Sequence, residues 1–292
     1  MMRIADTPSA QYNASPHRNK RRGRRADLVY PPVPMRLLAL ALVLAACAPG
    51  GTSPESKPTS PATPAAAPDA PPAADKQDEL TTSAGLVKIH PVNHATVRLE
   101  IGDKVVWVDP TSKGDLGGPR ADVVLITDVH SDHHDPAGLD AVRRPDSVIV
   151  APKAVADKVP GALALANGES KDLGFMRVEA VPMYNLQRGP EAGKLYHDKG
   201  RGNGYVLTVG DRRIYLSGDT ECTPEMRALK DIDVAFVCMN LPFTMPPAEA
   251  AECVAAFKPK VLYPYHYRDS NLDELDTALA GSSVEVRRRD WY

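Results

Sequence analysis

The sequence predicts a layered α/β sandwich, and three observations support that prediction. Two β-meanders lie far apart in the chain, and each has a Gly-Asp hairpin turn, at Gly102-Asp103 and Gly210-Asp211. Helical segments enter between short apolar strands after each meander. No Gly-x-Gly-x-x-Gly motif follows the first strand, so the strand-to-helix order is not that of a Rossmann fold.

The first half of the predicted domain begins with three strands. Alternating apolar residues predict these strands at Leu86–Pro91, Ala95–Ile101 and Lys104–Val108. Val123–Thr127 is a short β-branched run, typical of a fully buried strand. A helix and one more strand complete this half, at Pro136–Val142 and Ser147–Val150.

The second half follows a similar plan, with strands first and helices between the later ones. The expected strands are Gly204–Val209, Arg212–Ser217, Val234–Met239 and Val261–Pro264. The expected helices are Pro224–Lys230, Pro247–Phe257 and a final one near Leu272–Leu279. Meanders in both halves, with helices between strands, indicate two sheets in layers.

The N-terminal part of the sequence is typical of export. Arg36 is followed by the apolar run Leu37–Val43, which is too short to span a bilayer. Leu44-Ala45-Ala46-Cys47 resembles a bacterial lipobox, whose cysteine is acylated and becomes the mature N-terminus. We therefore expect an exported lipoprotein, anchored to a membrane at Cys47, in the periplasm or at the cell surface. The alternative is a cytosolic protein with an apolar N-terminus and a chance cysteine.

We divide the chain into four segments. Residues 1–34 form a basic extension, which is either a long n-region or a mis-assigned start before Met35. Residues 35–47 hold the signal peptide and lipobox, and residues 48–79 form a Pro/Ala-rich tether that buries too little apolar surface to fold. Residues 80–292 have the size of one domain.

Charge and cysteine content exclude some classes of partner. Residues 48–292 carry 27 basic and 35 acidic side chains, and polyanion binding needs clustered cations, so we expect no nucleic-acid partner. The cysteines after Cys47 are Cys222, Cys238 and Cys253, an odd number without a C-x-x-C spacing. We expect buried thiols, although an exported protein permits one disulfide.

Candidate metal ligands concentrate in the segment Thr127–Asp135, which contains three of the eight histidines. The segment follows a predicted buried strand, where a rigid scaffold can hold a functional loop. Alternate spacing lets Asp128, His130 and Asp132 converge from one side of a turn, and imidazole with carboxylate suits zinc, iron or manganese. The alternative is a solvated polar loop with surface histidines.

These residues resemble the signature of a known family. Asp128-x-His130-x-Asp132-His133 is similar to the His-x-His-x-Asp-His motif of the metallo-β-lactamase superfamily. Ser217-Gly218-Asp219-Thr220 resembles its bridging-aspartate motif, and Pro264-Tyr265-His266 resembles its final histidine motif. His94-Ala95-Thr96-Val97, followed by Val108-Asp109-Pro110, looks like the opening meander of the L-ascorbate-6-phosphate lactonase branch. The resemblance implies an αββα sandwich of two mixed sheets flanked by helices, with the site at the edge between the sheets.

The sequence departs from the family pattern at two places. Asp128 replaces the first histidine of the signature. Pro182-Met183-Tyr184-Asn185 lacks the family's histidine, and we propose that His197 replaces it from a longer loop, the alternative being a surface histidine. The segment Gly200–Gly204 is expected to be a flexible turn rather than a phosphate cradle, with Arg201 as a candidate for binding a substrate anion.

The resemblance implies roles for individual residues. The implied metal ligands are Asp128, His130, Asp132, His133, His197, Asp219 and His266, holding one or two ions, zinc first and iron or manganese as alternatives. Asp132 and His94 are the predicted catalytic residues, with His94 orienting substrate or a ligand. Asp109, Tyr184 and Tyr267 are expected to support metal-bound imidazoles, and His134 has a capping or supporting role.

Three classes of function follow. The first is a metal-dependent hydrolase that uses metal-activated hydroxide on an ester, lactone, amide or phosphodiester of a small-molecule substrate. The second is a di-iron redox or oxygen-handling member of the same fold. The third is a surface lipoprotein that binds metal without catalysis. A true β-lactamase is disfavoured, because that group keeps the first histidine of the signature.

Overall fold

The computed structural model describes residues 78–292. The expected basic extension, signal peptide, lipobox and most of the tether therefore lie outside the described residues. Within residues 78–292, no helix is both long and apolar enough to cross a membrane. The first strand begins at Asp78, so it includes Asp78 and Glu79 from the end of the expected tether.

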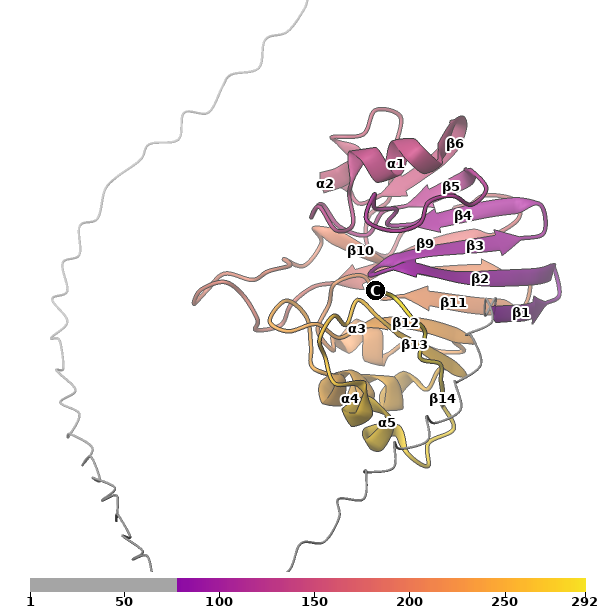
Figure 1. The fold of residues 1–292 in the computed structure, drawn as a ribbon. Helices are drawn as coiled ribbons and strands as arrows, with labels where there is room; N and C mark the ends of the chain where they lie inside the picture. Colours follow the sequence, from indigo (N-terminus) through magenta and orange to yellow (C-terminus); the bar gives the residue numbers. More distant parts are fainter. Residues whose placement is uncertain (1–77) are drawn as a thin grey trace, which may run out of the picture. The chain divides into compact units, whose positions relative to one another are not determined.

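The first sheet has seven strands in the order of the sequence (Figure 1). Neighbours are antiparallel from β1 to β4 and parallel from β4 to β7. The strands are β1 (Asp78–Thr82), β2 (Gly85–Asn93), β3 (Thr96–Ile101), β4 (Lys104–Val108), β5 (Ala121–Leu125), β6 (Arg143–Ala151) and β7 (Leu163–Ala164). The helices α1 (Pro136–Val142) and α2 (Lys153–Ala156) accompany this sheet.

The second sheet also has seven strands and mirrors the first in plan. Its strands are antiparallel from β8 to β11 and parallel from β11 to β14. They are β8 (Ser170–Asp172), β9 (Arg177–Met183), β10 (Gly202–Val209), β11 (Arg212–Leu216), β12 (Val234–Cys238), β13 (Val261–Tyr265) and β14 (Glu285–Val286). The helices α3 (Pro224–Arg227), α4 (Pro247–Phe257) and α5 (Leu272–Leu279) lie on the side of this sheet away from the first sheet (Figure 1).

Alternating side chains bury both faces of the sheets. On β5, Val123 and Leu125 enter the apolar core that also contains second-sheet residues, whereas Val124 and the next residue after the strand, Ile126, belong to the cluster with Leu139 of α1. A strand covered on both faces explains why this stretch is continuously apolar. The αββα sandwich of two mixed sheets flanked by helices is therefore confirmed.

Several elements differ from the sequence predictions. The strand β9 was not predicted, and the strand β6 begins at Arg143 rather than Ser147. Residues 143–148 are half-buried or exposed, so the start of β6 lacks an apolar pattern. The helix α3 ends at Arg227 instead of Lys230.

The prediction of unpaired cysteines is wrong for two of the three. Cys222, just before α3, and Cys253, in α4, form a disulfide with a Cα–Cα distance of 5.5 Å. The parallel strands β11, β12 and β13 place α3 and α4 side by side, a neighbourhood that cysteine spacing in the sequence does not reveal. Cys238 is a buried free thiol, as expected, and burial raises its pKa to about 12.

Candidate metal centre

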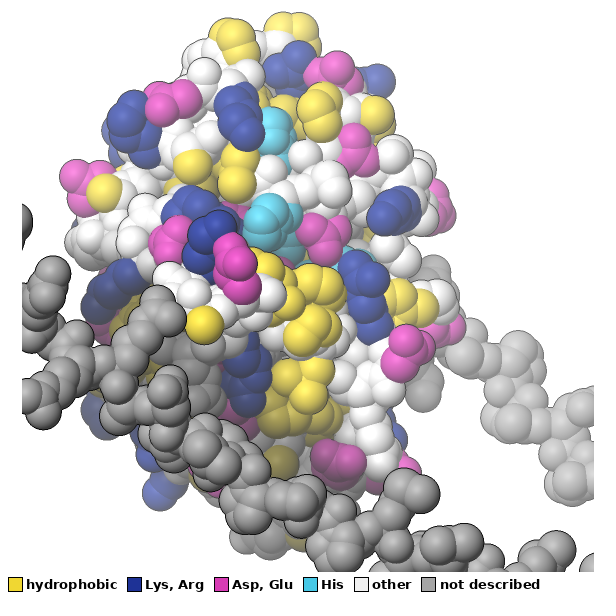
Figure 2. Space-filling model, turned by 90° about the vertical axis from the view of Figure 1, so that its left-hand side faces the viewer, with side chains coloured by type: hydrophobic (Ala, Val, Ile, Leu, Met, Phe, Trp, Pro, Cys, Tyr) yellow, Lys and Arg dark blue, Asp and Glu magenta, His cyan; other side chains and the backbone are white. Residues whose placement is uncertain are grey.

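The candidate site lies where strands of both sheets end. Asp109 follows β4, the loop 127–133 follows β5, Asp219 follows β11 and His266 follows β13. In α/β sheets, loops at the carboxyl ends of parallel strands converge on one edge and form binding sites. The loops therefore meet at one edge of the sandwich, and Figure 2 shows histidine side chains in the middle of that face, among acidic and basic side chains.

Four non-glycine residues at the site have left-handed backbone conformations. The φ angles are 54° for His94, 43° for Asp109, 49° for His266 and 44° for Arg268. Such conformations cost free energy and persist where the surroundings fix them, often at functional sites. These residues turn the chain shortly after β2, β4 or β13, on the edge of the sheets where the site lies.

A buried network orients His133. Asp109 Oδ2 lies 2.8 Å from His133 Nδ1, and its two carboxylate oxygens accept hydrogen bonds from the Thr127 amide at 2.8 Å and hydroxyl at 2.6 Å. All three side chains are buried. The network fixes His133 with Nε2 toward the site, as supporting carboxylates do for metal-bound imidazoles.

Three imidazoles converge on Asp219. The Nε2 atoms of His133 and His266 each lie 3.2 Å from a carboxylate oxygen of Asp219, and that of His197 lies 3.3 Å away. None of these nitrogen atoms makes a hydrogen bond of normal geometry, although all are buried.

A buried polar atom without a hydrogen bond is costly, so this cluster has donor atoms that need a ligand. Nitrogen and carboxylate oxygen are zinc, iron and manganese donors. The groups His133–Asp219–His266 and Asp128–His130–His197 each bring one donor atom per residue within 4.8 Å of one another. The residues present therefore fit a metal centre with Asp219 at its middle.

His197 reaches the cluster because Asn185 holds it. The Asn185 side-chain oxygen lies 2.8 Å from His197 Nδ1 and accepts a hydrogen bond from the His197 amide, also at 2.8 Å. Asn185 follows β9, where the family pattern has its histidine. The chain thus has an amide at that position, and this amide positions an imidazole from the next loop.

Asp128 is paired with a cation of the protein itself. Arg201 donates from Nη2 to Asp128 Oδ2 at 2.9 Å and from Nε to Oδ1 at 3.2 Å. His130 Nδ1 lies 2.9 Å from the same carboxylate, which is fully buried. The next residue, Gly202, packs closely below the loop, because a Cβ there would lie 2.6 Å from Met183 Cε and 2.9 Å from the Thr127 carbonyl oxygen. Arg201 is therefore engaged by Asp128, and the prediction that it binds a substrate anion is not supported by its position.

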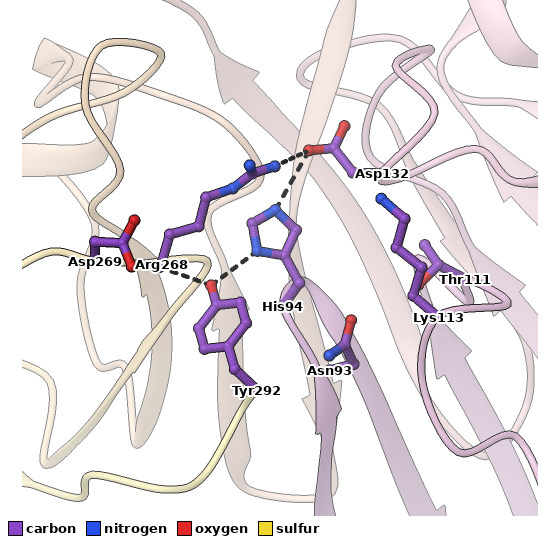
Figure 3. A pocket seen from close by; sticks show the side chains of 8 residues that line it. All are labelled: Asn93, His94, Thr111, Lys113, Asp132, Arg268, Asp269 and Tyr292. Atoms are coloured by element: carbon purple, nitrogen blue, oxygen red, sulfur yellow. Dashed lines mark hydrogen bonds and ion pairs between the residues drawn. The ribbon is translucent and has the colours of Figure 1, made fainter.

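Asp132 lies between two histidines on the open side of the site. Its Oδ2 atom lies 3.3 Å from His94 Nε2 and 3.6 Å from His266 Nε2. The Arg268 amide donates to the Tyr292 hydroxyl at 2.8 Å, and this hydroxyl lies 2.8 Å from His94 Nδ1 (Figure 3). Because the ionised Asp132 carboxylate can only accept, neutral His94 donates from Nε2 to Asp132, and its Nδ1 accepts from the Tyr292 hydroxyl.

The electrostatics favour a charged cluster. Burial opposes ionisation of Asp219, but the His266 and His133 imidazoles hold its pKa well below the usual value. Burial likewise opposes protonation of His133, but the Asp219 and Asp109 carboxylates raise its pKa well above the usual value. For His94, burial dominates and lowers its pKa to about 4, so this imidazole is neutral near pH 7.

Two pockets adjoin the cluster. One, of about 340 Å³, lies over it and is lined by His130, His197, Asp219 and His266, with Tyr196 and Phe243 as an aromatic wall. The other, of about 460 Å³, is drawn in Figure 3. Asp132 and Arg268 line both.

The structure brings all predicted metal ligands and both predicted catalytic residues to this site. Of the expected supporting residues only Asp109 contacts a cluster imidazole. The predictions for Tyr184 and Tyr267 are wrong, because their hydroxyls donate to Glu225 and to the Arg289 carbonyl. The side chain of His134 belongs to none of the candidate metal groups.

Sequence reasoning missed the positions of three site residues, which are Asn185, Arg268 and Tyr292. Asn185 occupies the family's histidine position, and this was a usable signal. Arg268 stands two residues after His266, so proximity along the chain was a weak signal. Nothing in the sequence links Tyr292 to His94.

Comparison with known proteins identifies the family. The model of the beta-lactamase superfamily domain matches residues 88–266. A metal-dependent hydrolase of Aeropyrum pernix is 29% identical over 204 residues, covering 62% of this chain and 83% of that protein. One of Enterococcus faecalis is 30% identical over 183 residues, covering 59% of this chain and 81% of that protein. A solved structure from Parabacteroides distasonis, provisionally named a metal-dependent hydrolase, is 39% identical with a TM-score of 0.71, covering 74% of this chain and 99% of that one. This chain therefore belongs to the family defined by the beta-lactamase superfamily domain.

Proposed function

We propose that this domain is a metal-dependent hydrolase that cleaves an ester, lactone, amide or phosphodiester bond in a small molecule. The observation that carries the proposal is the set of buried, unbonded Nε2 atoms of His133, His197 and His266 around Asp219. The names of the relatives support the same reaction class.

The cluster residues form two groups, each of which would hold one metal ion. His133, His266 and Asp219 would hold one ion, with Asp132 beside them, and Asp128, His130 and His197 would hold a second. A bound divalent metal supplies a hydroxide nucleophile near neutral pH and a Lewis acid for the developing oxyanion. Asp109 and Asn185 keep two of the imidazoles aimed at the centre. No protein nucleophile is needed.

His94 and Asp132 act on the substrate side. His94 is neutral and presents an Nε2 proton at 3.3 Å from Asp132 Oδ2, so it holds the orientation of that carboxylate. Asp132 faces both pockets and can accept a proton from water or pass one to a leaving group.

Metal content of protein purified without added metal tests the proposal. We expect zinc together with hydrolysis of activated esters or lactones, and loss of both in Asp219→Asn. Asp233→Asn is the matched control, because Asp233 is buried but binds Lys260 and Arg212 instead of histidines. Metal content unchanged in Asp219→Asn and in His266→Ala contradicts the site. A di-iron absorption spectrum supports the redox alternative, and tight metal without turnover supports a binding lipoprotein.

We further propose that the chain is an exported lipoprotein anchored at Cys47. The Cys222–Cys253 disulfide supports an oxidising compartment, because such bonds are rare in reducing cytosol. We expect the protein in the membrane fraction of expressing bacteria and Cys47→Ala in the soluble fraction, measured by fractionation and by mass spectrometry of the acylated N-terminus. An unmodified Cys47 in protein from bacterial membranes contradicts the proposal.

A further inference from the structure

We propose that the pocket drawn in Figure 3 binds a carboxylate or phosphate group of the substrate, with Lys113 and Arg268 as its cationic ligands. This inference rests on the proposed hydrolase function and adds the chemical class of the substrate. The group would lie beside the metal centre, at the end of the substrate away from the bond that is cleaved.

The position of the pocket favours a substrate group. Asp132 and Arg268 line both this pocket and the one over the Asp219 cluster, so a molecule at the cluster can extend past them. A volume of about 460 Å³ is suited to a small molecule. The pocket is therefore a second compartment of one binding site.

Lys113 stands on a turn that is fixed from two sides. Asp135 accepts hydrogen bonds from the Ser112 amide at 2.7 Å and from its hydroxyl at 2.6 Å, and the Gly114 amide donates to the Thr111 carbonyl at 3.1 Å. Among residues 78–292, no carboxylate lies within ion-pair distance of Lys113. Figure 3 shows its side chain extending toward Asp132. This ammonium group is available for an anion.

Arg268 approaches from the opposite side of the pocket in Figure 3. Its backbone is held by the hydrogen bond from its amide to Tyr292, while its guanidinium makes a 3.6 Å ion pair with Asp132. An arginine fork can bind a carboxylate or phosphate through two parallel hydrogen bonds. The backbone of Arg268 is thus fixed, while its guanidinium makes only a long ion pair with Asp132, so its N–H groups can bind an anion.

The acidic groups of the pocket do not oppose an anion there. Asp132 lies 3.6 Å from Arg268 and close to His94 and His266, so its carboxylate is turned toward the cluster side of the pocket. Asp269 lies beyond Arg268 in Figure 3, on the side away from Lys113 and Asp132. Lys113 is thus a cation of the lining without a carboxylate at ion-pair distance among residues 78–292, and Thr111 adds a hydroxyl beside it.

Paired substrates and a charge reversal test the proposal on the zinc-loaded full chain. Mono-4-nitrophenyl succinate carries a carboxylate that 4-nitrophenyl butyrate lacks. We expect Lys113→Glu to raise KM for the succinate ester by about 10- to 100-fold and to leave the butyrate ester almost unchanged. Lys171→Glu, on exposed β8, is the matched control.

Calorimetry gives a readout that does not depend on turnover. Titration with succinate in one arm and ethyl phosphate in the other distinguishes a carboxylate from a phosphate site. We expect one of them to bind wild type and Lys171→Glu alike, and to bind Lys113→Glu and Arg268→Gln more weakly. If neither anion binds the wild type, or if neither variant weakens the binding of the one that does, the proposal is overturned. If neither ester is hydrolysed, the hydrolase proposal fails on that panel, while the titration still decides the pocket.

Discussion

Replacing Asp109 by Asn tests whether His133 is positioned by the network behind it. The carboxylate serves three donors at 2.6 to 2.8 Å, which are the Thr127 amide, the Thr127 hydroxyl and His133 Nδ1. An Asn side chain has one carbonyl oxygen that can accept from these donors. Its amide nitrogen is itself a donor and would face the remaining donors without accepting from them. All the groups are buried, so water cannot compensate.

The magnitude follows from these contacts. Losing the charge and at least one of the three bonds should lower the free energy of unfolding of the metal-free protein by about 2–4 kcal/mol. A less well oriented His133 should weaken zinc binding by about 10- to 100-fold. Urea unfolding measures the first quantity, and competition with a chromophoric chelator measures the second.

Asp122→Asn is the matched control. Asp122 also accepts from a backbone amide, that of Val105 at 2.8 Å, and from a side chain, Arg144 at 2.6 Å, but it contacts none of the metal-site residues. We expect this variant to retain wild-type zinc affinity. Wild-type zinc affinity in a folded Asp109→Asn protein would refute the positioning role of Asp109.

Three further predictions concern the Asp128 pair and the disulfide. Arg201→Gln frees the Asp128 carboxylate, so calorimetry should show the second zinc ion binding about tenfold more tightly; an unchanged second affinity would count against an internal counter-ion. Burial of the Asp128 carboxylate raises its pKa, but His130, His133 and Arg201 outweigh this effect and lower the pKa to about 2. The ionised carboxylate should therefore stabilise the fold by about 2 kcal/mol above pH 3.8, and this stabilisation should be lost as the pH falls to about 2. Denaturant unfolding at each pH should show a steeper loss in the metal-free wild type than in Arg201→Gln. Equal slopes in the two proteins would contradict this. Cys253→Ser should cost about 2–4 kcal/mol of unfolding free energy, and reductant should affect only the wild type; insensitivity of the wild type to reductant would exclude the bond.

The sequence predicted the layered fold because its central strands carry clear patterns. Val123–Ile126 is apolar on both faces, and each Gly-Asp turn marks a hairpin inside one meander. The strand β9 was missed although Arg177–Ala180 alternates polar and apolar residues, because Val181-Pro182 ends that alternation and proline is rare inside a strand; its pairing with β10 supplies the missing information. Short strands such as β14 exist only through their neighbours.

The site was predictable where its residues share a loop. Asp128, His130, Asp132 and His133 follow one strand, so their convergence is local. The partners of these residues are not local, since Arg201 reaches Asp128 from a loop that the sequence describes only as glycine-rich. The disulfide is likewise a consequence of helix packing. Contacts between distant segments depend on the finished fold, and no local pattern encodes them.

Trp291 and Tyr292 make the turn at His94 depend on a segment that is distant in the sequence. The Trp291 carbonyl accepts hydrogen bonds from the His94 amide at 3.0 Å and from Asn93 Nδ2 at 3.1 Å, and the Tyr292 hydroxyl contacts the His94 ring. Both residues follow every other site residue along the chain. The turn at His94 can therefore be fixed only when residues 291 and 292 have docked against it. A substitution that loosens this segment should disturb the substrate side of the site from a position 198 residues away along the chain.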